Sequence, residues 1–224
     1  GSTILNDIEA LPKSLIFWRS STHFIGGLGV VVFLLLVLPQ ASPYRMKLTN
    51  MEMSSLSKDG YRYKSSKVIR IIVSVYIGFT IASFLALWAA GMSMFDALNH
   101  AFSIAATGGF STKNLSVAYY NSDLINCIFL FFMAICAMHF GLIYSVIVTG
   151  SLKPMNNSVV RYYFGSIIVC SFIIAISLMT QGGYTSWGRA AMDSTFTVVS
   201  YMSTAGFAIC DNAMWPALAG IVLM

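Results

Sequence analysis

The sequence predicts an all-α membrane protein built from repeated units, each with a membrane helix, a re-entrant pore loop and a second membrane helix. Composition supports the membrane class, because 57% of the 224 residues are hydrophobic and 9% are charged, with a mean hydropathy of +0.76. Soluble domains carry about 25% charged residues. The repeated units are predicted from a short segment that occurs once in each half of the chain.

This segment occurs as Phe95–Ser111 and again as Met192–Ala208, and the two copies align without a gap. Each copy has a helix-compatible pattern of about a dozen residues, which rises only ~20 Å, and ends in Thr-x-Gly-Phe. That rise is too short for a hydrocarbon layer of ~30 Å, so the pattern is typical of a pore loop. Two ordinary short helices capped by glycine are the alternative. The identical pairs are Asp96 and Asp193, Ser103 and Ser200, Thr107 and Thr204, Gly109 and Gly206, and Phe110 and Phe207.

Apolar stretches without Asp, Glu, Lys or Arg surround the two copies, and each reaches the ~20 residues that a membrane helix needs. The first span is expected to follow the interfacial anchor Trp18-Arg19 and to end at Pro39. Its glycines at 26, 27 and 29 would allow another helix to approach closely. The four stretches are Ser20–Tyr44, Ile71–Gly91, Leu124–Leu152 and Tyr162–Gly188.

The other expected elements start with a second span at Ile71–Ala90. Ser93 is the expected N-cap of the first short helix, Met94–Ala106, and Asp96 lies in its first turn, where a carboxylate suits the helix dipole. The later elements are a turn at Thr107–Thr112, spans at Leu124–Leu152 and Tyr162–Thr180, a short helix at Ala190–Ser203, a turn at Thr204–Ile209 and a span that opens at Trp215-Pro216.

Charge placement predicts the orientation of the spans. If they alternate, the connections Arg45–Arg70 and Lys153–Arg161 lie on one side, with nine of the thirteen basic residues and two of the eight acidic ones. Basic residues beside membrane helices mark the cytoplasmic side, so both Gly turns are expected on the outer side. We expect a multi-pass protein of the plasma (inner) membrane, in contact with the lipid bilayer. The net charge of +5 reflects this topology, and no nucleic-acid partner is expected.

The sequence favours transport over catalysis, because it shows no pattern typical of an enzyme active site. The cysteines have no metal-ligand spacing, Cys127, Cys136 and Cys170 are interpreted as small buried hydrophobic residues, and no cofactor is expected. A turn beyond a short helix can present backbone carbonyls in place of a cation's hydration shell, and glycine permits the dihedrals that this requires. Thr107 and Thr204 offer further oxygens, which suit sodium or potassium.

The histidines are further candidates. His139 lies inside an apolar span, where ionisable groups are often functional, and with Gly141 it is a candidate hinge or gate. A neutral, hydrogen-bonded packing histidine is the alternative. His100 is expected to support the first turn rather than bind an ion, and His23 has no assigned role.

Four motifs occur together, and their combination is more specific than any one of them. They are Thr107-Gly108-Gly109-Phe110-Ser111-Thr112, Ser203-Thr204-Ala205-Gly206-Phe207, Trp18-Arg19 before Ile25-Gly26-Gly27-Leu28-Gly29, and Trp215-Pro216 after the second turn. Over essentially the whole chain, this pattern resembles the TrkH/KtrB family of potassium transporters. The resemblance implies four potassium-channel-like repeats around one pore, with one filter glycine in each repeat.

The same resemblance implies a site and partners. Gly109 and Gly206 match the filter glycines of the second and third repeats, and Gly1 matches the end of the first filter. A homodimer bound by cytosolic nucleotide-binding regulatory subunits is implied, with the potassium ion as transported substrate. The candidate potassium filter residues are Gly1, Thr107, Gly108, Gly109, Phe110, Ser203, Thr204, Ala205, Gly206 and Phe207.

The resemblance also divides the chain, as a fragment of the four-repeat architecture. Residues 1–67 would end repeat 1, residues 68–160 would form repeat 2, and residues 161–224 would form repeat 3, truncated in its inner helix. The expected function is translocation of monovalent cations, with potassium uptake as the main hypothesis. A sodium-permeable or sodium-coupled transporter, a non-conducting membrane scaffold or sensor with the same fold, and a solute transporter of another type are the alternatives.

Overall fold

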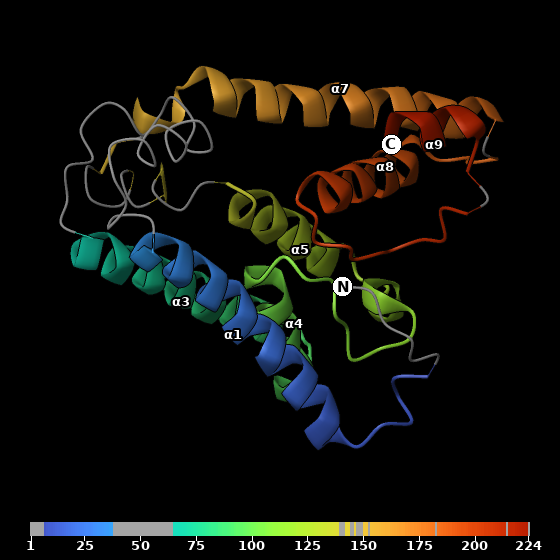
Figure 1. Ribbon diagram of the computed structural model, residues 1–224. Helices are drawn as coiled ribbons and strands as arrows, with labels where there is room; N and C mark the ends of the chain where they lie inside the picture. The colour runs from blue at the N-terminus through green and yellow to red at the C-terminus, as the bar shows by residue number, and fades with distance from the viewer. Residues whose placement is uncertain are drawn as a thin grey trace.

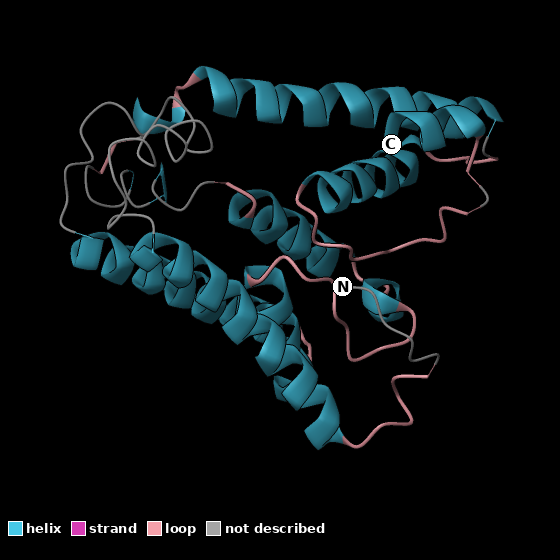
Figure 2. Ribbon diagram, viewed as in Figure 1, coloured by secondary structure: helices cyan, strands magenta, loops and turns pink. Residues whose placement is uncertain are grey.

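The computed structural model describes residues 7–37, 65–138, 142–143, 146, 150–151, 153–181, 183–213 and 215–223. Every regular element within these ranges is a helix (Figure 2), which confirms the all-α class. The α-helices are α1 (Lys13–Val37), α3 (Ser65–Ala89), α4 (Met94–Ala105), α5 (Asp123–Cys136), α7 (Ser158–Gln181), α8 (Trp187–Met202) and α9 (Ala217–Leu223), and the 3-10 helices are η3 (Ser116–Tyr120) and η4 (Lys153–Met155).

Two of the described helices are long and apolar enough to cross a membrane, by length and composition. They include Arg70–Ala89 of α3 and the whole of α7, each with a mean hydropathy of 2.1. The chain enters α3 and α7 at the left of Figure 1 and leaves α1 and α5 there, so the long elements alternate in direction. This alternation agrees with the predicted order of spans.

Each short helix packs against long helices of the fold. Helix α4 contacts α1 and α3, whereas α8 contacts α7, and α5 lies between these two groups with contacts to α3, α4 and α8 (Figure 1). Helix α9 then packs on α7. The result is two groups, each with one short helix, joined through α5.

The hydrophobic core extends over α3, α4, α5, α7, α8 and α9. Phe129 of α5, Ile174 of α7 and Phe196 of α8 are all completely buried, and close van der Waals packing of such side chains holds helices together in a bilayer. On the outer face of α7, Ile168 and Phe172 are 68% and 63% exposed. Large exposed apolar side chains on a helix that can span a bilayer fit a surface that faces lipid or further membrane helices.

The structure corrects three details of the sequence interpretation. Helix α8 begins at Trp187, before the predicted start at Ala190, and α5 ends at Cys136, whereas one span over Leu124–Leu152 was expected. Cys127 is exposed rather than buried. A run without charged residues predicts that a segment is apolar. It does not predict which face of the helix packs against other helices, and Cys127 lies on an exposed face.

The expected close approach at the glycines of α1 is confirmed at one position. A Cβ atom on Gly27 would lie 3.0 Å from the Tyr76 hydroxyl and 3.2 Å from Cβ of Ala106, so α3 and the end of α4 both contact α1 there. Within the described part of the chain, a Cβ on Gly26 or Gly29 would meet no atom within 4 Å.

Candidate functional site

The first short helix begins with a hydrogen-bonded cap. The Asp96 N–H donates to Ser93 Oγ at 3.1 Å, and the Ser93 hydroxyl donates to Asp96 Oδ2 at 2.8 Å. Ser93 has the extended backbone of an N-cap, as predicted. A cap of this kind typically stabilises a helix by about 1 kcal/mol, so it defines where α4 begins.

Both short helices end in the same hydrogen-bond pattern. The N–H of Thr107 donates to Ile104 O at 3.0 Å and the N–H of Gly108 donates to Ser103 O at 2.8 Å. In the second copy, Thr204 donates to Tyr201 O at 3.0 Å and Ala205 donates to Ser200 O at 3.0 Å. This pair of bonds is the Schellman motif, and it occurs at equivalent positions of the two repeated segments.

The backbone beyond these helices is also repeated. Thr107 and Thr204 have φ values of 50° and 56°, and Gly109 and Gly206 have φ values of 71° and 76°. Glycine adopts this region freely, but the left-handed conformation costs other residues roughly 1–2 kcal/mol. A β-branched threonine held there twice indicates a requirement other than helix capping, for which glycine is the favoured residue.

A serine of each short helix holds the end of the turn. Ser103 Oγ accepts the Phe110 N–H at 2.6 Å, and the Ser200 hydroxyl donates to the Phe207 carbonyl at 2.7 Å. Both serines are buried. Both turns are therefore tied back to their helices at the same phenylalanine. The bonded group is the N–H of Phe110 in the first turn and the carbonyl of Phe207 in the second.

The two turns meet at their glycines. An added Cβ on Gly109 would overlap the Ala205 carbonyl oxygen and would lie 2.9 Å from the Gly206 carbonyl carbon. Gly206 is exposed and Gly109 is half-buried. Segments 97 positions apart in the sequence thus place equivalent backbone atoms in contact. Each of these turns directly follows the C-terminal end of its short helix, α4 or α8.

His100 supports the first turn, as expected. Its ring is completely buried, with Nδ1 2.8 Å from the Asp96 carbonyl and Nε2 2.9 Å from Ser111 Oγ. A carbonyl only accepts, so Nδ1 carries a hydrogen. Asp96 in turn accepts the Thr112 hydroxyl at 2.6 Å. Positions 111 and 112 are thereby held to α4 by side chains.

Asn114 links the segment after the first turn to the start of the described chain. Its Oδ1 accepts the Ile8 N–H at 2.7 Å, its Nδ2 donates to Asp7 Oδ1 at 2.8 Å, and its N–H donates to Glu9 Oε1 at 3.2 Å. The hydrogen bond from Asn114 is the main reason that the pKa of Asp7 is lowered from its usual 3.8. We refer to residues 7–9 with Asn114 as the N-terminal link.

The segments after the two turns are also joined to each other. The Ala118 N–H donates to the Ala208 carbonyl at 3.2 Å, and the Ala208 N–H donates to Ser116 Oγ at 3.3 Å. In the second unit, the Tyr184 hydroxyl donates to the buried Asp193 carboxylate of α8 at 2.8 Å. Burial, together with this bond, raises the pKa of the Tyr184 phenol. Consecutive units are therefore connected by hydrogen bonds beside the turns.

Most of the predicted site residues lie together. All candidate filter residues except Gly1 belong to the two turns or to the ends of the helices before them, whereas Gly1, His139 and Gly141 lie outside the described residues. Sequence interpretation missed Asn114 and the contacts of Arg19 and His23 with the first turn, and it assigned Arg19 to an interfacial anchor. These residues act through contacts with distant parts of the chain, which the local spacing of residues does not predict.

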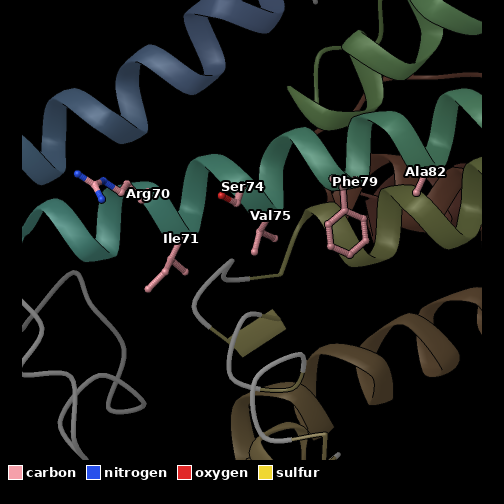
Figure 3. A pocket seen from close by; sticks show the side chains of 7 residues that line it. Arg70, Ile71, Ser74, Val75, Phe79 and Ala82 are labelled. Atoms are coloured by element: carbon pink, nitrogen blue, oxygen red, sulfur yellow. The ribbon is translucent and has the colours of Figure 1, made fainter.

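A separate groove of about 420 Å³ lies along α3 (Figure 3), and no candidate filter residue lines it. The described residues contain no group of three or more His, Cys, Asp or Glu side chains that could hold a metal ion. The lining residues of the groove are Arg70, Ile71, Ser74, Val75, Gly78, Phe79 and Ala82.

Comparisons with known proteins identify relatives of the chain. The family model of TrkH, a cation transport protein, matches residues 1–176. The chain is 32% identical over 230 residues to the Trk system potassium uptake protein TrkH of Escherichia coli (strain K12), covering 100% of the chain and 47% of that protein. It is 32% identical over 208 residues to an uncharacterized cation transporter of Methanocaldococcus jannaschii, covering 92% of the chain and 40% of that protein.

The fold is similar to that of a solved transporter. The crystal structure of the potassium transporter TrkH from Vibrio parahaemolyticus matches with a TM-score of 0.83 and 29% identity, covering 100% of the chain and 45% of that one. The predicted class, an all-α membrane protein with repeated pore-loop units, is confirmed by this match. The chain spans about half the length of the curated relatives that it matches. Since the family model covers well over half of its residues, the chain belongs to the TrkH family of cation transport proteins.

Proposed function

We propose that the protein of which this chain is part translocates monovalent cations across a membrane, with potassium uptake as its function. The supporting observation is the contact between the two turns at Gly109 and Gly206, each with the same Thr and Gly backbone conformation. Two unrelated helix caps would not be expected to contact each other. The relatives are named as transport or uptake proteins, and potassium is the ion in the name of the Escherichia coli protein.

In this proposal the backbone performs the selection. The C-terminal ends of α4 and α8 carry the negative ends of the helix dipoles, and both helices end immediately before the turns. Carbonyls of the turns replace part of the cation's hydration shell. The proposed potassium site consists of Thr107, Gly108, Gly109, Phe110, Ser203, Thr204, Ala205, Gly206 and Phe207, with Gly1 from the first repeat. No cofactor takes part.

The proposed organisation is that of the repeats. Residues 1–67 end the first, residues 68–160 form the second, and residues 161–224 begin the third. The protein is multi-pass in the plasma (inner) membrane, with the basic connections in the cytoplasm and the turns on the outer side. Basic residues near membrane helices favour this orientation.

We further propose a homodimer that binds nucleotide-binding regulatory subunits on its cytoplasmic face. The basic composition of the connection 45–70 favours such a partner. The check is purification of the full-length protein in mild detergent. A dimer with a cytosolic subunit is expected, whereas a monomer with no associated subunit would contradict this part of the proposal.

The transport proposal is tested with the full-length protein in a host that lacks its own potassium uptake. Rubidium uptake, inhibited by potassium in preference to sodium, is the expected result. Uptake inhibited equally well by sodium would favour the sodium-permeable alternative. A well-folded protein in the membrane without any cation uptake would contradict transport and favour a non-conducting scaffold.

A further inference from the structure

Two side chains of α1 contact the first turn from outside its own unit. The Arg19 guanidinium lies over the Phe110 ring, 3.9 Å from its centroid, and the His23 ring centroid lies 4.6 Å from that of Phe110. Residues four apart lie on one face of a helix, so Arg19 and His23 approach the turn together. Cation–π and ring contacts of this kind favour one position of the Phe110 ring.

The His23 ring also occupies the space beside Gly108. The three atoms nearest to an added Cβ at position 108 are Cε1, Nδ1 and Nε2 of His23, with Nε2 at 2.5 Å. Gly108 is not among the glycines with positive φ. Its backbone would therefore accept alanine, and the neighbouring ring explains the glycine.

The second turn provides an internal comparison. Ala205 occupies the position equivalent to Gly108, and it is completely buried in the hydrophobic core. The second phenylalanine, Phe207, instead lies 5.0 Å from the Phe129 ring of α5 and 6.1 Å from the His100 ring. Each turn thus has its phenylalanine packed on a helix of the preceding unit, α1 for Phe110 and α5 for Phe207.

In the part of the chain that the structure describes, no hydrogen bond at Nδ1 accounts for the position of the His23 ring. Its Nδ1 is buried and, within the described residues, has no hydrogen-bond partner. Packing against Gly108 and Phe110 is therefore what holds the ring.

We propose that Arg19 and His23 form a clamp that positions the first turn, with His23 and Gly108 acting as a size-matched pair. Neither residue touches the ion in this proposal, so both are positioning residues. A larger residue at position 108 displaces either the His23 ring from Phe110 or the turn itself. Removal of the imidazole makes room for that residue again. This inference rests on the proposed cation transport.

The test compares Gly108→Ala, His23→Ala and the double variant in the full-length protein. Competitive uptake of rubidium against sodium is measured, together with the amount of monodisperse protein and its thermal midpoint. Gly108→Ala is expected to reduce potassium preference by roughly tenfold or more. The double variant should recover to the level of His23→Ala alone, because the alanine methyl then occupies the space that the ring has left.

Gly26→Ala is the matched control, since Gly26 lies on α1, as His23 does, and no atom of the described residues lies within 4 Å of the added methyl group. It should leave uptake and stability unchanged. A double variant that is no better than Gly108→Ala in uptake and in thermal midpoint would overturn the pairing.

The pairing is separable from the transport proposal. If the wild-type protein takes up no cation, transport fails, while the thermal midpoints still show whether His23→Ala rescues Gly108→Ala. If the wild type selects potassium and Gly108→Ala does so equally well, the clamp fails and transport stands.

Discussion

An added Cβ on Gly109 would lie 2.9 Å from the carbonyl carbon of Gly206, whereas an added Cβ on Gly206 would lie 3.9 Å from Cα of Gly109. The two equivalent glycines therefore contact each other unequally. Gly109 is required both for its φ of 71° and for the space beside it, and Gly206 is required mainly for its φ of 76°.

Gly109→Ala should consequently be more damaging than Gly206→Ala. Both variants have the strain of a positive φ, roughly 1–2 kcal/mol, but only the first also displaces the opposite turn. The thermal midpoints of the two purified full-length variants, compared with wild type, measure this difference. Equal midpoints would contradict the observed contact between the turns.

The strain at the threonines is open to a stability test. Thr204→Gly removes a side chain that disfavours a φ of 56°, whereas Thr204→Ala loses the same hydroxyl and retains the strain. We expect the glycine variant to be more stable than the alanine variant by about 1 kcal/mol. Denaturant unfolding of both variants measures the difference, and a more stable alanine variant would show that Thr204 is not held in the left-handed region.

The N-terminal link predicts a charge-dependent effect. Asn114→Asp replaces the Nδ2 donor by an oxygen that faces the Asp7 carboxylate, so the variant should have a lower thermal midpoint at neutral pH. Asp7→Asn in that background should restore part of the loss, because an amide donor is present again. A double variant as unstable as Asn114→Asp would argue against this hydrogen bond.

The same link has a defined pH dependence. The hydrogen bond from Asn114 stabilises charged Asp7, and it lowers the pKa of Asp7 below 3.8. Its contribution to stability is therefore complete above that value and is lost as the pH falls through the lowered folded-state pKa. In Asn114→Ala this part of the acid dependence should be absent.

The orientation is tested by labelling single cysteines in a background without the native four. Leu115, 67% exposed, lies in the segment after the first turn, and Asn156 is exposed in the connection before α7. On intact cells an impermeant maleimide should label Leu115→Cys but not Asn156→Cys. The reverse pattern would invert the topology derived from the basic residues.

Local features of the fold were predictable from the sequence. The repeated segment, the Ser93 cap and the glycine turns depend on spacing and on residue type, and these are read directly from the chain. Helix ends were less predictable. The start of α8 at Trp187 depends on the Ser186 backbone, which is extended, and apolar composition does not define it.

The contacts between units could not be predicted, because they join residues about a hundred positions apart. Asn114 bonds to residues 7–9 within the first group of helices, and Gly109 meets Gly206 across the two groups that α5 joins. Gly108 is the clearest example. Its sequence context suggests a flexible turn, yet the structure shows that the His23 ring takes the place of a side chain.

The central claim is that the two turns line one cation path, and Gly206→Ser in the full-length protein tests it most directly. Competitive uptake of rubidium against sodium should show that potassium preference falls by at least about tenfold, equivalent to ~1.4 kcal/mol. Gly78→Ser on α3 is the control, since an added Cβ at Gly78 meets no atom of the described residues within 4 Å and the φ of Gly78 is not positive. Gly91 is unsuitable as a control, because its φ is 100°. Wild-type potassium affinity and sodium exclusion in Gly206→Ser would mean that the Thr-x-Gly-Phe turns are helix caps and not a filter.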